Sequence, residues 1–252
     1  AVPLASSLSN GLGIYNGLSG VLSNLILWGV PWWMGRLYGS QPGAQRDLLV
    51  GFLLGGLAYV PICLWEMRMS PQLNHWVYGF YPFRFSTTRR FGGYRPVGFL
   101  RHGIELGMLM MSGTLVGVWL WTVGEKRRLV GLPVSWVSAI MLAVTIFTRA
   151  LGAWLLLAIG LFTLFATKTT RNGLLLLMLL LMPVSYIGAR LVGVQADALT
   201  SLAAVVDPER GQSLAHRIYH EGMLTTKALQ RPILGWGGWG RGRIYDEQGS
   251  DV

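Results

Sequence analysis

The sequence has almost no cysteine and few charged residues. Cys63 is the only cysteine in 252 residues, which excludes an intrachain disulfide and a metal cluster held by several thiolates. Charged residues make up 13% of the chain and hydrophobic residues 52%. Because soluble domains usually contain about 25% charged residues, this composition excludes an ordinary soluble domain and points to a lipid environment.

The apolar residues are gathered in long stretches that carry at most one charge near an end. These stretches cover about residues 14–34, 48–65, 104–124, 129–148, 150–167 and 172–189. An α-helix of ~20 residues crosses the ~30 Å hydrocarbon layer of a bilayer. We therefore predict an all-α membrane protein, a polytopic helical bundle of about six transmembrane helices within residues 1–192. Both ends of the sequence are expected to be cut from a longer membrane protein.

Short loops with lysine and arginine define one side of the predicted bundle. They cover residues 35–47, 125–128 and 168–171, and the positive-inside rule places such loops in the cytoplasm. Because loops alternate between the two sides, the loop 66–101, the turn at Arg149 and residues 193–252 then lie outside. We therefore expect a multi-pass protein of the bacterial inner (cytoplasmic) membrane whose active face is toward the periplasm.

The outward loop 66–101 contains arginine but no lysine, and it has no carboxylate between its first and last arginine. Its arginines are Arg68, Arg84, Arg89, Arg90, Arg95 and Arg101. The guanidinium group is a planar fork that binds phosphate through two hydrogen bonds, so we interpret this loop as an anion-binding segment. Snorkelling to lipid headgroups, or pairing with acids elsewhere, stays open. The loop is also rich in aromatic residues, which favour the membrane interface.

Arg149 and Glu105 are single ionisable residues at predicted span ends. Arg149 lies between two spans with almost no loop, and ionisable residues at membrane depth are costly and often functional. Contact with a lipid headgroup is the alternative for Arg149. Glu105 follows Arg101 by four residues and His102 by three. It either neutralises Arg101 or serves as a general base.

Residues 193–252 are predicted to begin a large periplasmic loop that contains an amphipathic helix over 213–229. Asp207 and Glu209 precede this helix and suit its N-terminus, although their spacing also allows a metal site. His216 and His220 fall on one helix face, but no third metal ligand is evident. The glycine run that begins at Gly235 lacks the ending of a phosphate-binding P-loop. It permits a sharp turn or a close approach to a ligand.

Three local patterns resemble the O-antigen ligase and O-antigen polymerase family of bacterial membrane glycan transferases. The first is Gly93-Tyr94-Arg95-Pro96-Val97-Gly98 followed by Arg101-His102-Gly103, and the second is Thr148-Arg149-Ala150-Leu151-Gly152-Ala153. The third is Arg217 on a helix followed by Arg231-Pro232-Ile233-Leu234-Gly235-Trp236-Gly237. Their order along the chain, and their place on predicted outward segments, agree with that family.

The resemblance implies the fold of the membrane glycosyltransferase C class. It also implies periplasmic transfer of a glycan from undecaprenyl diphosphate to a hydroxyl of a saccharide acceptor, as in lipopolysaccharide biosynthesis. Members work without a metal or other cofactor, and arginines stabilise the diphosphate leaving group. The catalytic residues would be Arg95, Arg149 and Arg217. Substrate binding is assigned to Arg89, Arg90, Arg101, His102, Arg231, Gly235 and Gly237. The expected partners are the lipid-linked glycan, the acceptor and membrane lipids, with no nucleic acid.

The general base and the acceptor cannot be assigned from these residues. The ligase pattern has a histidine after the large loop, and neither His216 nor His220 fits that place. A different class, a transporter or flippase of a lipid-linked or anionic solute, typically has broken helices and polar residues within its spans. The predicted spans are nearly free of charge, which favours a site at the membrane surface. A structural scaffold would leave the arginine excess unexplained.

Overall fold

The structure, a computed structural model, describes residues 2–90, 92–124, 128–194, 201, 208–238 and 240–245. Within these residues the chain is mostly helical and has two short β-hairpins. It divides into two compact units. One unit is Gln41–Leu176, and the other combines Ala1–Ser40 with Leu177–Val252.

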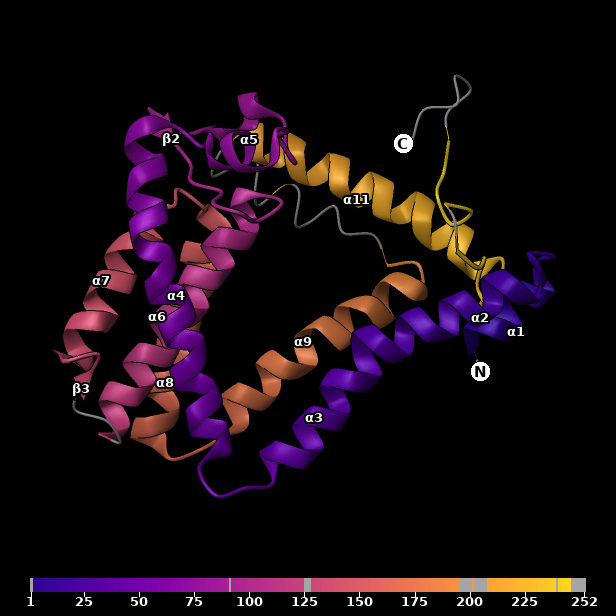
Figure 1. Ribbon diagram of the computed structural model, residues 1–252. Helices are drawn as coiled ribbons and strands as arrows, with labels where there is room; N and C mark the ends of the chain where they lie inside the picture. The colour runs from indigo at the N-terminus through magenta and orange to yellow at the C-terminus, as the bar shows by residue number, and fades with distance from the viewer. Residues whose placement is uncertain are drawn as a thin grey trace. The chain divides into compact units, whose positions relative to one another are not determined.

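Four helices pack together in the unit Gln41–Leu176 (Figure 1): α4 (Ala44–Met69), α6 (Gly103–Val123), α7 (Val134–Phe147) and α8 (Leu151–Thr170). One end of this bundle carries α5 (Leu73–Tyr78), the 3-10 helix η2 (Phe85–Thr88) and a hairpin of β1 (Arg89–Arg90) and β2 (Gly93–Tyr94). The opposite end carries a hairpin of β3 (Arg128–Leu129) and β4 (Leu132–Pro133).

Small residues let α6 approach α7 closely. A Cβ atom built on Gly113 would lie 2.5 Å from Met141 Cε, and one on Gly117 would lie 2.6 Å from Ser138 Oγ. The hydroxyls of Thr114 on α6 and Thr145 on α7 are 2.9 Å apart. Membrane helices commonly associate in this way, because lipid gives no hydrophobic drive to bring them together. Several apolar side chains from α4, α6 and α7 are fully buried: Leu53, Leu106, Met110, Leu120, Val137 and Met141.

Four described helices are long and apolar enough to cross a membrane: α4, α6, α8 and α9 (Leu174–Leu191). The prediction of a helical membrane protein is confirmed to this extent, and the count of six spans stays a prediction. The helix expected from residue 129 begins only at Val134, because β3 and β4 pair across a turn in which Val130 and Gly131 have φ angles of 50° and 79°. The resulting α7 has 14 residues, about 21 Å at ~1.5 Å per residue.

Other helix ends differ from the predicted boundaries by a few residues. Helix α4, expected over 48–65, is longer at both ends, because it begins after Gly43 and ends before Ser70, both at positive φ. Glu66 therefore belongs to this helix and not to the loop 66–101. The bounds of α6, α8 and α9 lie close to the predicted ranges.

The second unit contains α1 (Val2–Ser9), then α2 (Gly13–Asn24), a π-helical turn η1 (Leu25–Gly29) and α3 (Val30–Gly39) in one continuous helix. The span predicted at 14–34 falls on this helix. The π turn has a local cause at Pro31, which has no backbone N–H and whose ring crowds the carbonyl four residues back. The N–H of Val30 accordingly donates to the carbonyl of Leu25, five residues back.

The last described helix is α11 (Pro208–Leu229), which begins five residues before the predicted start at 213. Glu209 therefore lies in its first turn. Asp207, and the basic residues predicted for the loop 125–127, lie outside the described residues.

Candidate functional site

Two of the segments singled out in the sequence meet at one end of the bundle Gln41–Leu176. In the β1–β2 hairpin, Arg90 pairs with Gly93. The guanidinium of Arg149, from the turn between α7 and α8, donates through Nη1 to the carbonyl oxygen of Arg90 at 2.8 Å. It covers Gly93 so closely that a Cβ atom there would overlap Nη1. The glycine is thus required where the arginine crosses the hairpin.

The backbone of the α7–α8 turn directs Arg149 toward the hairpin. Arg149 has a φ of 54°, a left-handed conformation that costs energy for any residue with a Cβ atom. On one side of it, the buried Thr148 hydroxyl donates to Thr145 O at 2.7 Å. On the other side, Ala150 is buried against α6, where a Cβ atom on Gly107 would lie 2.7 Å from that of Ala150. Packing on both sides therefore fixes the strained residue between them.

Arg95 is buried without a partner for its Nε. The residue is only 5% exposed, and no described residue accepts a hydrogen bond from Nε. Its backbone N–H donates to Thr88 O at 2.7 Å. Burial, and next the charge of Arg90, lower the pKa of Arg95 to about 10, so the guanidinium is still protonated at neutral pH. A buried cation without a counter-charge is costly, and an anionic ligand would relieve that cost.

Glu66 supports the segment that follows Arg95. Its carboxylate is fully buried, and Oε2 accepts hydrogen bonds from the N–H groups of Val97 and Gly98, both at 2.7 Å. Asn74 Nδ2 donates to the carbonyl oxygen of Gly98 from the other side. Glu66 was not among the predicted site residues. The available signal was a single carboxylate at the end of an otherwise uncharged stretch, because such a group is expensive to bury unless it has a task.

His102 caps the N-terminus of α6. Its Nδ1 accepts a hydrogen bond from the N–H of Ile104 at 3.1 Å, so in the neutral ring the proton is on Nε2. Burial first, and then the charges of Arg95 and Arg90, lower the pKa of His102, while Glu105 opposes this effect. The ring is therefore neutral at pH 7 and offers a donor to a ligand.

Among the described residues, Glu105 forms no salt bridge with the arginines around it. Glu105 Oε2 accepts from the backbone N–H of Arg101 at 3.1 Å. The contact of Glu105 is therefore with the backbone of Arg101, and the predicted salt bridge with the Arg101 side chain is not formed in the structure. Across the described part of the chain, no acidic side chain forms an ion pair with the arginines of this cluster. The cluster consists of Arg89, Arg90, Arg95, Arg101 and Arg149, and we call it the arginine cluster.

The remaining predicted residues belong to the other unit. Arg217 is exposed on α11. Arg231 donates to Asn10 Oδ1 and lies over the ring of Trp236, with 4.6 Å from its Cζ to the ring centroid. Gly235 and Gly237 have φ angles of 66° and 77°. The carbonyl of Gly235 accepts from Asn10 Nδ2 at 3.1 Å, and the glycine-rich segment thereby closes onto the α1–α2 connection.

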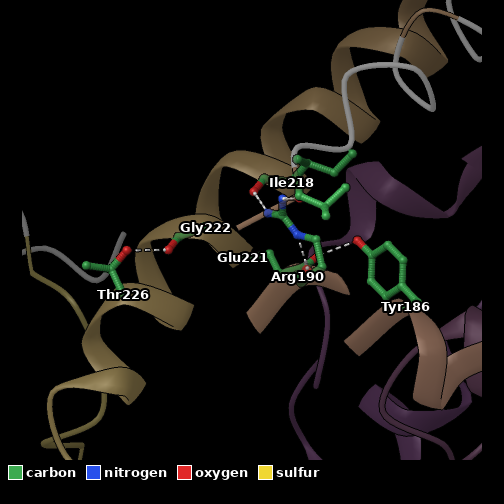
Figure 2. A network of polar contacts seen from close by, with 7 residues as sticks. Tyr186, Arg190, Ile218, Glu221, Gly222 and Thr226 are labelled. Carbon is green, nitrogen blue, oxygen red and sulfur yellow. Dashed lines mark hydrogen bonds and ion pairs between the residues drawn. The ribbon is translucent and has the colours of Figure 1, made fainter. Parts of the chain in front are cut away.

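A second polar network, within this other unit, joins α9 to α11 and was not predicted (Figure 2). Arg190 Nε lies 3.0 Å from Glu221 Oε1, and the hydroxyl of Tyr186 donates to Oε2 of the same carboxylate at 2.9 Å. Arg190 also donates to the carbonyl of Val194 at 3.0 Å. This arginine is neutralised within the protein, in contrast to the arginine cluster.

Metal ligands are not gathered in the part of the chain that the structure describes. The rings of His216 and His220 lie 4.1 Å apart between centroids on α11. No third histidine, cysteine or carboxylate joins them, or forms another such group, among the described residues.

No protein-family model matches the chain, and no curated protein or solved structure matches it. The resemblance to O-antigen ligases and polymerases therefore stays a hypothesis that depends on the residue patterns.

Proposed function

We propose that this chain transfers a glycan from undecaprenyl diphosphate to a hydroxyl of a saccharide acceptor, with the arginine cluster binding the diphosphate. The observation that carries the proposal is the meeting of Arg149 with the hairpin of Arg89 and Arg90, next to the buried and unpartnered Arg95. Four further considerations, on charge, metal, orientation and resemblance, support it.

The first consideration is the charge that develops in the reaction. When the bond between sugar and diphosphate breaks, negative charge grows on the leaving phosphate oxygens. Cations already aimed at that charge stabilise the transition state more than the ground state. Arginine also matches two phosphate oxygens at once. In this mechanism Arg95 and Arg149 hold the diphosphate, and Nε2 of His102 donates a further hydrogen bond.

The second consideration is that the carboxylates near the arginine cluster form hydrogen bonds with the backbone. Glycosyl transfer to an acceptor often depends on a divalent metal held by paired carboxylates. Here Glu66 and Glu105 each accept backbone N–H groups. The arginine cluster can supply the positive charge in place of a metal.

The third consideration is orientation. Lys168 Nζ, at the end of α8, donates to Thr122 O near the end of α6, so these two ends lie together, opposite the arginine cluster. A lysine at that end agrees with a cytoplasmic side there. We propose that the arginine cluster faces the periplasm of a bacterial inner membrane. We also propose that α7 and the α2–α3 helix are two further spans, which gives the six spans of a protein of the glycosyltransferase C class.

The fourth consideration is the resemblance of Arg217, Arg231, Gly235 and Gly237 to the family's large periplasmic loop. We propose that Arg217 takes part in catalysis and that the other three contribute to substrate binding. Their roles are tested by the same assay as the arginine cluster, with separate variants.

The test uses the full-length protein in lipid nanodiscs with an undecaprenyl-diphosphate-linked oligosaccharide and a saccharide acceptor. Arg95 and Arg149 are each changed to Ala and to Lys. Loss of one preorganised donor costs roughly 10²–10³ in turnover, and Lys should not restore it because it lacks the planar fork. Arg171, which is exposed after α8, provides matched control variants. Full turnover by the Lys variants would contradict diphosphate binding by paired hydrogen bonds.

The alternative of a transporter or flippase is favoured by one observation, the π-helical interruption η1 inside the α2–α3 helix. Broken helices often mark substrate sites in transporters, and π turns are frequent at functional sites. A flippase would move a fluorescent lipid-linked glycan between leaflets of a proteoliposome without cleaving it. Transfer of the glycan to the acceptor, without such movement, supports the enzyme.

A further inference from the structure

A cavity lies within the unit formed by Ala1–Ser40 and Leu177–Val252, between α1, α2 and residues 234–238. Its volume is about 560 Å³, inside the range of about 300–1,000 Å³ that is usual for small-molecule sites. None of its lining residues belongs to the arginine cluster. Gly235 and Gly237, to which the proposed function gives a part in substrate binding, are in its wall, but the proposed function does not say which part of the substrate they meet.

The described lining of the cavity combines polar with apolar groups, Val2 and Pro3 among the latter, and it is uncharged. Hydroxyls and amides come from both helices: Ser6, Ser7, Asn16, Ser19, Ser23 and Asn24. No described lining residue is Asp, Glu, Lys, Arg or His. A diphosphate would have no counter-charge here, whereas a neutral ligand rich in hydroxyls would find both donors and acceptors.

The hydrogen-bonding groups of this lining are available to a ligand. Ser6 and Ser7 are each 6% exposed, and their hydroxyls have no partner among the described residues, although both line the cavity. The amides of Asn16 and Asn24 donate to carbonyls of their own helix, at 2.8 and 2.9 Å, which leaves their amide oxygens to accept. Both hydroxyls open to the cavity, where a ligand or water can form hydrogen bonds with them.

The opposite wall of the cavity is partly apolar, and its tryptophan is held by contacts within the protein. Trp236 is held by a hydrogen bond from its Nε1 to Lys227 O at 2.8 Å and by Arg231 over its ring. Gly237 lies against Leu12, where a Cβ atom would come within 2.8 Å of Leu12 Cδ1, and would be 3.8 Å from Ser6 Oγ. A glycine at this point brings the backbone up to the serines. A hydroxyl-lined face opposite an aromatic and glycine face suits a sugar ring, which has polar edges and apolar C–H faces.

We propose that this cavity binds a neutral saccharide, which would be a sugar of the glycan or of its acceptor. The assignment of a saccharide, in preference to another neutral ligand rich in hydroxyls, rests on the proposed function. The lining serines donate to and accept from sugar hydroxyls, and the amide oxygens of Asn16 and Asn24 accept from them.

The experiment is saturation-transfer NMR on the full-length protein in nanodiscs, with maltotriose and triacetylchitotriose as probes. Saturation transfer to at least one probe is expected. Two exposed serines are then changed together, Ser19→Leu and Ser23→Leu, to fill the cavity from α2, and the affinity should fall about tenfold or more. The control is Ser9→Leu, an exposed serine of α1 that does not line the cavity. A milder pair, Ser6→Ala with Ser7→Ala, removes hydroxyls without adding bulk and should also weaken binding.

Equal signals from the parent and both double variants, or no saturation transfer from either probe, would overturn the proposal. Turnover of the lipid-linked glycan is measured on the same samples. A protein that turns over glycan but binds neither trisaccharide retains the proposed function and loses this site. A protein that binds a trisaccharide at this cavity without turnover retains the site and loses the transferase function.

Discussion

At the scale of single residues, the site depends on arginines that the protein positions without neutralising. Arg190 shows the contrasting arrangement, because Glu221 balances its charge. Arg149 instead donates to a backbone carbonyl and keeps its full charge. A carbonyl orients the guanidinium while leaving other N–H groups free for a ligand.

The contact between Arg149 and Gly93 predicts the effect of adding one methyl group. In Gly93→Ala the new Cβ would occupy the place of the Arg149 guanidinium, and the long side chain would move aside. Glycan transfer should fall about 10²-fold, since a misplacement of ~1 Å can cost that much, while the fold is kept. The matched control is Gly152→Ala, where a Cβ meets no atom within 4 Å. Equal turnover in both variants would show that the position of Arg149 is unimportant.

The capping role of His102 predicts a pH dependence of stability. Its pKa is lowered from 6.5 in the folded protein, so the unfolded chain takes up the proton at higher pH than the folded chain. The contribution to stability is therefore constant above about pH 6.5 and is lost as the pH falls below it. His102→Asn keeps a capping side chain but does not titrate. The melting temperature should decrease more from pH 7.5 to pH 5 in the native protein than in this variant. An equal decrease in both proteins would contradict the prediction.

Arg95 and Arg149 were chosen as candidates from the sequence, whereas the contacts that position them were not predictable from it. An arginine at a span end is conspicuous because its cost in lipid is high. Glu66 lies far from Val97 in the chain, and only the folded structure shows that its carboxylate accepts the N–H groups there. The overlap of Gly93 with Arg149 likewise depends on a tertiary contact. No local pattern predicts it.

At the scale of elements, the arginine cluster depends on how closely α6 packs against the α7–α8 turn. Gly107 faces Ala150 and Ala153 there, with 2.7 and 3.3 Å from a Cβ built on the glycine to theirs. Ala150 lies in the turn before α8 and Ala153 in α8, and neither methyl group can move aside without a shift of the backbone. The position of Arg149 is therefore coupled to the packing of α6.

Because of this coupling, a substitution on α6, away from the β1–β2 hairpin, should affect the position of Arg149. Gly107→Ala should push the α7–α8 turn off α6, destabilise the bundle by about 1–3 kcal/mol through overpacking, and lower glycan transfer. Gly55→Ala on α4 provides the control, since its Cβ would meet no atom within 4 Å. Thermal unfolding in detergent and turnover are measured on both variants. If Gly107→Ala matches the control in both unfolding temperature and turnover, the packing of α6 does not determine the position of Arg149.

Helix length was the least predictable property of the elements. Residues 129–133 are nearly as apolar as the helix that follows them, so hydropathy alone extends the helix backward. In the structure the left-handed turn at Val130 and Gly131 prevents the helix from beginning earlier. A β-branched residue such as Val130 rarely has a positive φ, so the sequence does not predict this turn. The π turn before Pro31 was missed for a related reason, because the apolar pattern continues through it.

At the scale of the whole protein, the unit Gln41–Leu176 has two chemically different ends. One end carries the arginine cluster and exposed aromatic side chains, including Trp76 and Phe80. At the other end, Lys168 reaches Thr122. Such asymmetry is common in proteins that present one face to each side of a membrane.

The proposed orientation can be tested by labelling single cysteines in a Cys63→Ala background. Phe80→Cys lies in the aromatic loop and Gly173→Cys follows α8, and both positions are exposed. A membrane-impermeant maleimide added to cells with a permeabilised outer membrane should label Phe80→Cys. It should label Gly173→Cys only after the inner membrane is lysed. Labelling of Gly173→Cys alone in intact spheroplasts would reverse the orientation and place the arginine cluster in the cytoplasm.

The packing of α6 against α7, through glycine, serine and threonine residues, should respond to salt differently from phosphate binding by the arginine cluster. This packing depends on close contacts and a pair of hydroxyl groups, which dissolved salt hardly affects. The attraction of exposed guanidinium groups for a phosphate is screened over a Debye length of about 8 Å at physiological salt and about 3 Å at 1 M. Raising the salt concentration should therefore weaken the contribution of the exposed arginines to binding of the proposed lipid diphosphate, while the helices stay assembled. This change should be reversible and should not unfold the protein.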